Sequence, residues 1–354
     1  MSLSIKDFGA YHGKQASLFT MKNTNGVTAC VTNAGASIVS ILVPDKTGKV
    51  QDVVLGYDSA PEYEKGHSFF GFSVGRHGNR IGRGRFTIGG RQYQVACNDG
   101  PNHLHGGPEG FNTYLWKYNI ISEGEEPSVR FFIQSPDGDQ GFPGTMDVSI
   151  TFTLNRYNGL ELHFEAVSDK DTICNLTNHC YYNLSGEPDA HTIEDHEIYI
   201  RSRFFTPCDE YALTTGEICK VEGTPFDFRH SRPIGQQINA DNEQIKNGGG
   251  YDHNFCLDFH EEDEPVCILT DSASGRIMEV YTDQPGLQLY TGNGLDGTEH
   301  GHGNRLYPRR AGVCLETQFY PNGSSFSHFP TPVLKAGQQY SHRVEYRFRV
   351  VDSK

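Results

Sequence analysis

The stretch VSITFTLNRYNGLELHFEAV at residues 148–167 decides the fold class of this sequence. Its two arms, residues 148–154 and 160–167, are rich in β-branched and aromatic side chains. Between them lies Asn155-Arg156-Tyr157-Asn158-Gly159, a run of residue types that favour turns. Two such arms joined by a short loop that contains glycine predict a β-hairpin.

The hairpin pattern recurs elsewhere in the chain. Residues 38–43 and 50–55 flank a turn at Asp45-Lys46-Thr47-Gly48. Residues 85–88 and 92–95 flank Gly89-Gly90, a pair that tolerates the positive φ of a two-residue turn. Short strands separated by turn signals over a long chain are typical of an all-β architecture.

The same patterns predict further strands, two short helices and one turn elsewhere in the chain. Helical periodicity is confined to two short segments, and one polar run predicts a solvated turn. Because no internal repeat or composition break divides the chain, we expect residues 1–354 to form one domain, a large β-sandwich. Further strands are predicted at 194–200, 266–270, 277–282, 287–290, 313–317 and 340–351, short helices at 61–65 and 234–245, and the turn at 260–264.

Composition excludes several functional classes. The net charge of −14 opposes nucleic-acid binding and does not favour phosphorylated substrates. No apolar run approaches the roughly 20 residues that span a bilayer, and residues 1–16 lack the apolar core of a signal peptide. Nine cysteines without a Cys-x-x-Cys pair indicate reduced thiols. We therefore expect a cytoplasmic protein without nucleic-acid or membrane partners. Composition does not decide between a monomer and a homodimer, the two states that we expect.

Three polar islands in apolar or glycine-rich settings indicate an enzyme. His179 lies between Asn178 and a Tyr-Tyr pair, His105 precedes two glycines, and Glu316 lies within an apolar strand pattern. Histidine exchanges protons near neutral pH, and a buried carboxylate must be paired, protonated or functional. Two imidazoles and a carboxylate spread over half the chain predict one assembled acid/base site.

Other interpretations of these residues stay open from the residues alone. His103 and His105 would face the same side of a strand, a spacing that metal ligands also use, with His179 and Glu316 completing the set. The chain lacks a recognised zinc motif, so we do not expect a metal site. Either histidine could instead be a core residue held by a backbone carbonyl, and Glu316 could face outward.

Two glycine-rich loops carry groups suited to binding a polyol. Asn79-Arg80 follows Gly75-Arg76-His77-Gly78, a loop that could aim a guanidinium at vicinal hydroxyls. Asp252 follows Gly248-Gly249-Gly250 and offers an acceptor carboxylate. Each signal is weak alone.

Taken in order, six blocks of this sequence resemble the galactose mutarotase (aldose 1-epimerase) family. Tyr320 and the pair His77-Gly78 depart from the pattern of that family at positions to which no role is assigned. The blocks are residues 75–81, 102–107, 177–179, 250–254, 284–293 and 315–318.

The resemblance implies a galactose mutarotase-like supersandwich that interconverts the α and β anomers of free aldohexoses such as D-galactose and D-glucose. It implies Glu316 as the general base at the C1 hydroxyl, His179 as the general acid at the ring oxygen, and His105 as an assisting histidine. The positions that would hold sugar hydroxyls are Asn79, Arg80, Asp252 and Gln288.

Opening and reclosing a sugar ring needs a base and an acid but neither redox chemistry nor group transfer, so we expect no cofactor and no metal. We hypothesise that Glu316 is ionised and His179 protonated in the free enzyme, which gives a bell-shaped pH profile. The alternatives are a hexose-6-phosphate 1-epimerase, a non-catalytic sugar-binding protein, and a glycoside hydrolase that uses Asp252 and Glu316.

Overall fold

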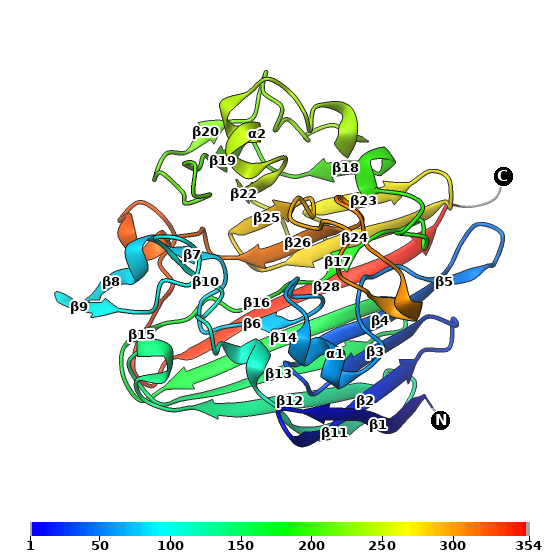
Figure 1. Cartoon of the computed structure of the whole chain (residues 1–354), viewed down its shortest axis with the longest axis horizontal. Coiled ribbons are helices and arrows are strands. Elements are labelled where there is room, and N and C mark those ends of the chain that lie inside the picture. The colour runs from blue at the N-terminus through cyan, green and yellow to red at the C-terminus, as the bar shows by residue number, and fades with distance from the viewer. Residues whose placement is uncertain (1, 352–354) are drawn as a thin grey trace.

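The computed structural model describes residues 2–351, which form three large antiparallel sheets (Figure 1). The nine-stranded sheet contains, in spatial order, β11 (Lys117–Ser122), β12 (Ser128–Ser135), β13 (Met146–Leu154), β14 (Gly159–Ser168), β28 (Gln339–Val350), β24 (Arg276–Thr282), β23 (Cys267–Asp271), β18 (Glu197–Ile200) and β21 (Arg232–Pro233). The six-stranded sheet contains β17 (Tyr181–Tyr182), β26 (Val313–Gln318), β25 (Gly286–Tyr290), β22 (Asp252–Cys256), β19 (Phe204–Thr206) and β20 (Cys219–Lys220).

The N-terminal part of the chain forms the third sheet, and eight short strands form four two-stranded ribbons. That sheet contains β1 (Leu3–Tyr11), β2 (Lys14–Lys22), β3 (Thr28–Thr32), β4 (Ser37–Pro44) and β5 (Val50–Asp52). The ribbons pair β6 (Ser73–Val74) with β16 (Thr177–Asn178), β7 (Arg80–Ile81) with β10 (His103–Leu104), β8 (Arg85–Ile88) with β9 (Arg91–Gln94), and β15 (Thr172–Ile173) with β27 (Val333–Leu334). Two short helices, α1 (Ala60–Lys65) and α2 (Glu243–Gly248), lie outside the sheets.

The predicted hairpin of residues 148–167 lies in the interior of the nine-stranded sheet, next to β28. Strands β13 and β14 pair in register from Met146 with Ser168 to Leu154 with Leu160. The side chain of Asn155 accepts hydrogen bonds from the backbone of Tyr157 and Gly159, both at 2.9 Å, which closes the turn. The predicted hairpin is confirmed, and so is the all-β sandwich.

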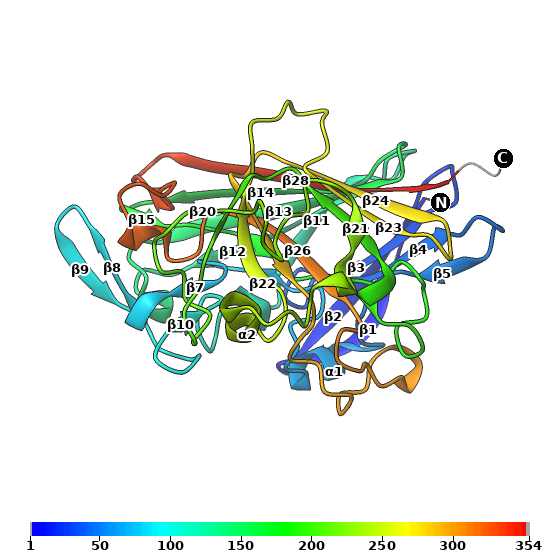
Figure 2. The ribbon, with the colours of Figure 1, turned by 90° about the horizontal axis from the view of Figure 1, so that it is seen from above.

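The nine-stranded and six-stranded sheets pack face to face. Along each strand, alternate side chains point into the core between the two sheets. On β26, Val313 and Leu315 join the main apolar cluster, and the hydroxyl of Tyr346 on β28 donates to the carbonyl of Leu315. Cys314 and Glu316 alternate with these two residues along the strand, so their side chains point to the opposite face of the sheet. All six residues of β26 are nevertheless buried, because loops cover that second face (Figure 2).

Most other predicted elements are confirmed, and two are corrected. The hairpins around 45–48 and 89–90, helix α1 and the exposed turn at 260–264 are present. Residues 194–200 are not one strand, because residues 193–195 form a 3-10 turn and β18 begins at Glu197.

The helix predicted over residues 234–245 is also wrong in extent. It divides into a 3-10 turn, Ile234–Gln236, and helix α2, which begins only at Glu243. The side chain of Asn242 accepts from the backbone of Gln244 and Ile245, so this residue caps α2 and does not continue a helix through it. Within residues 2–351, no helix has the length and apolarity needed to cross a membrane.

Candidate active site

Strand β26 delivers the carboxylate of the site. Glu316 lies opposite Gln288 on β25, which lies opposite Asn254 on β22, so three polar side chains form a row across the sheet face. Glu316 is 2% exposed, and its Oε2 has no hydrogen-bond partner among the described residues. A buried carboxyl oxygen left unpartnered is costly unless it serves a ligand or a proton transfer.

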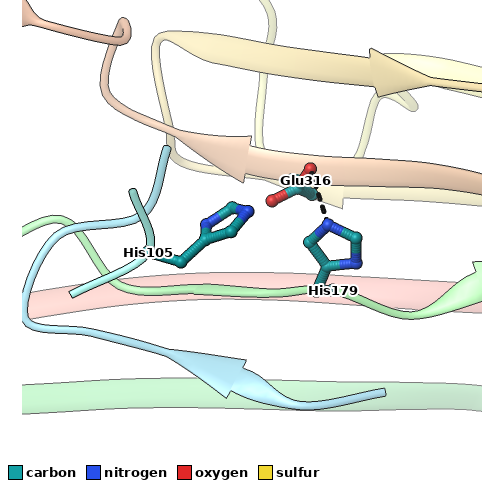
Figure 3. A group of neighbouring side chains, drawn as sticks. All are labelled: His105, His179 and Glu316. Atoms are coloured by element: carbon teal, nitrogen blue, oxygen red, sulfur yellow. Dashed lines mark ion pairs between the residues drawn. The ribbon is translucent and has the colours of Figure 1, made fainter. Parts of the chain in front are cut away.

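His179 lies beside this carboxyl. Its backbone N–H donates to the carbonyl of Phe72 at 2.8 Å, and its carbonyl accepts from Gly71 at 3.0 Å, so two hydrogen bonds fix the segment after β16. The imidazole Nε2 lies 3.8 Å from Oε1 of Glu316 (Figure 3). That separation is an ion-pair distance and leaves the two groups free to bond to a ligand between them.

His105 reaches the same carboxyl from the loop after β10 (Figure 3). Its ring lies at 90° to that of His179, with the ring centroids 5.1 Å apart. Its Nδ1 accepts a hydrogen bond from the backbone N–H of Asn79 at 3.1 Å. The Nε2 of neutral His105 therefore carries the hydrogen and points a donor into the site.

The prediction that His103 and His105 face the same side of a strand is wrong. Strand β10 ends at Leu104, and His105 adopts a positive φ of 51° that turns its ring toward Glu316. His103 instead places Nδ1 2.8 Å from the carbonyl of Ala96 and its ring edge against Phe142. The left-handed backbone at residue 105 breaks the alternation that the prediction assumed.

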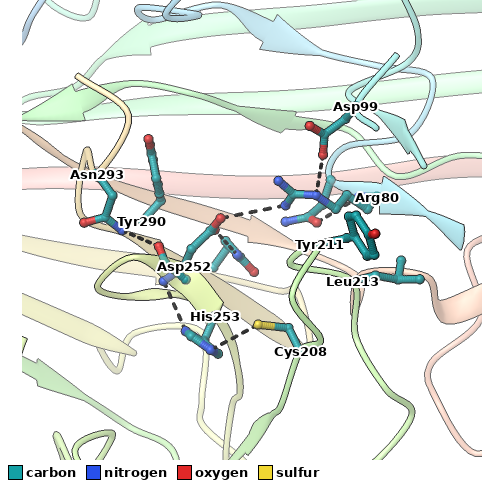
Figure 4. A network of polar contacts seen from close by, with 12 residues as sticks. Arg80, Asp99, Cys208, Tyr211, Leu213, Asp252, His253, Tyr290 and Asn293 are labelled. Atoms are coloured by element: carbon teal, nitrogen blue, oxygen red, sulfur yellow. Dashed lines mark hydrogen bonds and ion pairs between the residues drawn. The ribbon is translucent and has the colours of Figure 1, made fainter. Parts of the chain in front are cut away.

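Arg80 and Asp252 form the polar wall of the site (Figure 4). The guanidinium Nε donates to Asp99 Oδ2 at 2.7 Å, and Nη1 lies 3.7 Å from Asp252 Oδ2. The amide of Gln288 donates to Asp252 Oδ1 at 2.6 Å. Asp252 is thereby held on two sides, which fixes the position of its carboxylate.

These groups line a cavity of about 330 Å³, near the lower end of the range of small-ligand sites. Asn79, Arg80 and Asp252 line it together with both histidines and Glu316, whereas Gln288 lies behind Asp252. A larger groove of about 950 Å³ runs over the outer face of the nine-stranded sheet, but its lining contains no histidine. We place the site in the smaller cavity, because Glu316, His179 and His105, whose pKa values burial perturbs, converge there.

Burial favours the uncharged form of each proton-exchanging group. It raises the pKa of Glu316 to about 8, with the charge of Asp252 adding to the rise and Arg80 opposing it. It lowers the pKa of His179 to about 4 and that of His105 well below its usual value. Burial would lower the pKa of Arg80 too, but Asp252 and Asp99 raise it.

These pKa values correct the expected charges, because they favour a protonated Glu316 and a neutral His179 in the free protein. The hypothesis drawn from the sequence instead placed this proton on the imidazole of His179 and left Glu316 ionised. Both arrangements hold one exchangeable proton and no net charge, so one proton transfer connects them.

The three residues also have the composition of a metal site, with one ligand atom from each lying within 4.8 Å of the others. The hydrogen bond from the backbone N–H of Asn79 to Nδ1 of His105 argues against metal binding in this geometry. A nitrogen that carries hydrogen has no lone pair for a metal, so the inward-facing Nε2 of His105 is not a ligand. Glu316 and His179 then offer two ligands, one fewer than the three protein ligands of an open zinc site.

Sequence reasoning missed several residues that shape the cavity. Phe69 packs against both imidazoles, with ring centroids 5.2 Å from His105 and 5.9 Å from His179. Tyr181 and Tyr290 also line the cavity, and their rings lie beside that of His179. Tyr290 falls within a recognised block, but Phe69 lies in an ordinary Ser-Phe-Phe-Gly segment that carries no signal.

An all-β sandwich whose cavity combines a carboxyl, two histidines and hydroxyl acceptors defines an enzyme class that moves protons on polyhydroxylated small molecules. Residues 17–347 match the aldose 1-epimerase family, and the chain belongs to that family.

Individual relatives cover nearly the whole chain. The galactose mutarotase of Sus scrofa is 42% identical over 316 residues, 89% of each chain, and the aldose 1-epimerase of Escherichia coli K12 is 34% identical over 95% of this chain and 96% of its own. The crystal structure of a galactose 1-epimerase from Lactobacillus acidophilus superimposes with a TM-score of 0.87 at 29% identity, covering 98% of both chains.

Proposed function

We propose that this protein is an aldose 1-epimerase, an isomerase that interconverts the α and β anomers of free aldohexoses, with D-galactose and D-glucose as substrates. The observation that carries the proposal is the convergence of Glu316 and His179 in a hexose-sized cavity of a chain that belongs to this family. We also propose a single domain over residues 1–354, a cytoplasmic location, and a monomer or homodimer as the working state.

The two groups divide the proton transfers of ring opening. Carboxylate Glu316 removes the proton from the C1 hydroxyl while the imidazolium of His179 protonates the ring oxygen, so the C1–O5 bond breaks and an open-chain aldehyde forms. Rotation about C1–C2 presents the other face of the carbonyl, and the reverse transfers close the ring. Glu316 ends ring opening protonated and His179 neutral, which is the arrangement that burial favours.

The other residues hold the sugar and the developing charge. His105 donates from Nε2 toward the ring oxygen or an adjacent hydroxyl, a role that a neutral imidazole fulfils. Asp252, fixed by Arg80 and Gln288, accepts from sugar hydroxyls, and Asn79 and Arg80 contribute further contacts. This set of residues requires no redox group.

The wall of the cavity argues against a phosphorylated substrate. Among the described residues that line it, Arg80 alone carries a permanent positive charge. Asp99 and Asp252 already neutralise that guanidinium, so a sugar phosphate would meet repulsion where it needs several cations. Galactose should therefore be a better substrate than galactose 6-phosphate.

Polarimetry on freshly dissolved α-D-galactose tests the proposal, with α-D-glucose in parallel. The protein should accelerate the approach to the same final rotation, and Glu316→Gln should lose about 10³-fold in kcat. Glu161→Gln, on strand β14 of the nine-stranded sheet, is the matched control and should retain activity. If the protein bound galactose but did not accelerate mutarotation, it would be a sugar-binding protein and not an enzyme.

A further inference from the structure

One thiol contacts the nitrogen of His179 that does not face Glu316. Cys314 lies two residues before Glu316 on β26, so both side chains point to the same sheet face. Its Sγ lies 3.6 Å from Nδ1 of His179, while Oε1 of Glu316 lies 3.8 Å from Nε2. One strand therefore holds the imidazole at both nitrogens.

This arrangement bears on the tautomer of His179. The proposed mechanism returns His179 to the neutral form with a lone pair on Nε2, so the ring hydrogen must stay on Nδ1. A hydrogen on Nδ1 needs an acceptor, since the residue is only 6% exposed. Sulfur of a thiol is a weak acceptor and lies within reach of Nδ1.

We propose that Cys314 is a positioning residue whose sulfur accepts the hydrogen of Nδ1 and so reserves Nε2 of His179 for proton exchange. The proposal rests on the proposed function. It makes the two histidines complementary, because the backbone N–H of Asn79 fixes the hydrogen of His105 on Nε2 instead. One ring is a fixed donor toward the substrate, and the other has an inward nitrogen free to gain and lose a proton.

A neutral acceptor suits this role better than a carboxylate would. A charged partner on Nδ1 would stabilise the imidazolium and hold the second proton on the ring. Cys314 is fully buried, and burial raises the pKa of its thiol well above the usual value, so the group stays uncharged. Glu316, Tyr181, Tyr290 and His105 are the other titratable groups that face this ring.

Kinetics of two substitutions test the role. Cys314→Ala should lower kcat for galactose mutarotation about tenfold with little change in KM, and Cys314→Ser, which restores an acceptor, should recover most of the loss. Cys267→Ala removes a buried thiol from β23 and is the matched control for packing. Wild-type kcat in Cys314→Ala, or equal losses in the alanine and serine variants, would overturn the proposal.

Nitrogen-15 NMR of histidine-labelled protein gives a readout that does not depend on activity. The signals of His179, assigned by their loss in His179→Asn, should show hydrogen on Nδ1 in the wild type and a mixture of tautomers in Cys314→Ala. Hydrogen on Nε2 in the neutral wild type would overturn the proposal. If the wild type shows the expected tautomer but no mutarotation, the proposed function fails while the contact stands.

Discussion

The backbone N–H of Asn79 donates to Nδ1 of His105 at 3.1 Å, and the backbone N–H of His105 donates in return to the carbonyl of Asn79 at 3.2 Å. Both residues have positive φ angles, 61° and 51°. The reciprocal pair joins the loop before β7 to the loop after β10 and holds two strained residues in place. As a consequence, His105 is a permanent Nε2–H donor directed at the cavity.

This fixed donor leads to the first prediction. His105→Ala should lower kcat about 10²-fold, because a donor to the developing charge is lost, and His105→Gln should recover part of it through its amide N–H. His163→Ala, on the outer face of β14, should behave as wild type. Polarimetry over a pH series decides the role. Disappearance of the acid limb in His105→Ala would show that His105 itself titrates in the reaction.

The second prediction concerns pH. The competent pair of Glu316 and His179 holds one proton, so activity requires a pH between the two pKa values. Below about 4 the imidazole gains a second proton, and above about 8 the carboxyl loses the remaining one. The plot of kcat/KM against pH should be a bell with limbs near these values. A flat profile between pH 5 and pH 9 would contradict the assignment.

Two substitutions should move the alkaline limb in opposite directions. The charge of Asp252 raises the pKa of Glu316 and that of Arg80 lowers it. Asp252→Asn should therefore shift the limb to lower pH, and Arg80→Gln should shift it to higher pH. Asp99→Asn is the control, because Asp99 pairs with Arg80 but does not itself line the cavity. Shifts of the same sign in both variants would be incompatible with this electrostatic account.

The parts of this molecule that follow from local pattern could be predicted from the sequence. The arms around Asn155 alternate with period two and close through a side-chain turn, so local chemistry alone determines the hairpin. The candidate site residues came from ordered blocks of sequence, and the structure brings His105, His179 and Glu316 together over 211 residues of chain.

The parts that depend on tertiary contact could not be predicted. The positive φ of His105 depends on the backbone of Asn79, which approaches from another loop. The pKa values of Glu316 and His179 depend on burial by segments that periodicity does not place. Phe69 reaches both imidazoles only because the chain folds back there, and its sequence neighbours give no indication of that contact.

A buried arginine far along the chain shows the same dependence on tertiary structure and gives the last prediction. Arg276 on β24 is fully buried, and its guanidinium donates to backbone carbonyls of separate segments. Its acceptors are the carbonyls of Val43, Lys49, Leu184 and Ser185 and the side chain of Gln51. The residue thereby links the nine-stranded sheet to the turn between β4 and β5 and to the segment after β17.

Arg276→Met should lower the free energy of unfolding by about 3 kcal/mol or more, because several buried acceptors each lose a donor. Arg349→Met, one strand away on β28, removes a half-exposed ion pair with Glu279 and should cost less than about 1 kcal/mol. Urea denaturation followed by tryptophan fluorescence compares the two, since Trp116 is buried and is the single tryptophan of the chain. Equal midpoints for the two variants would show that the links made by Arg276 contribute no net stability.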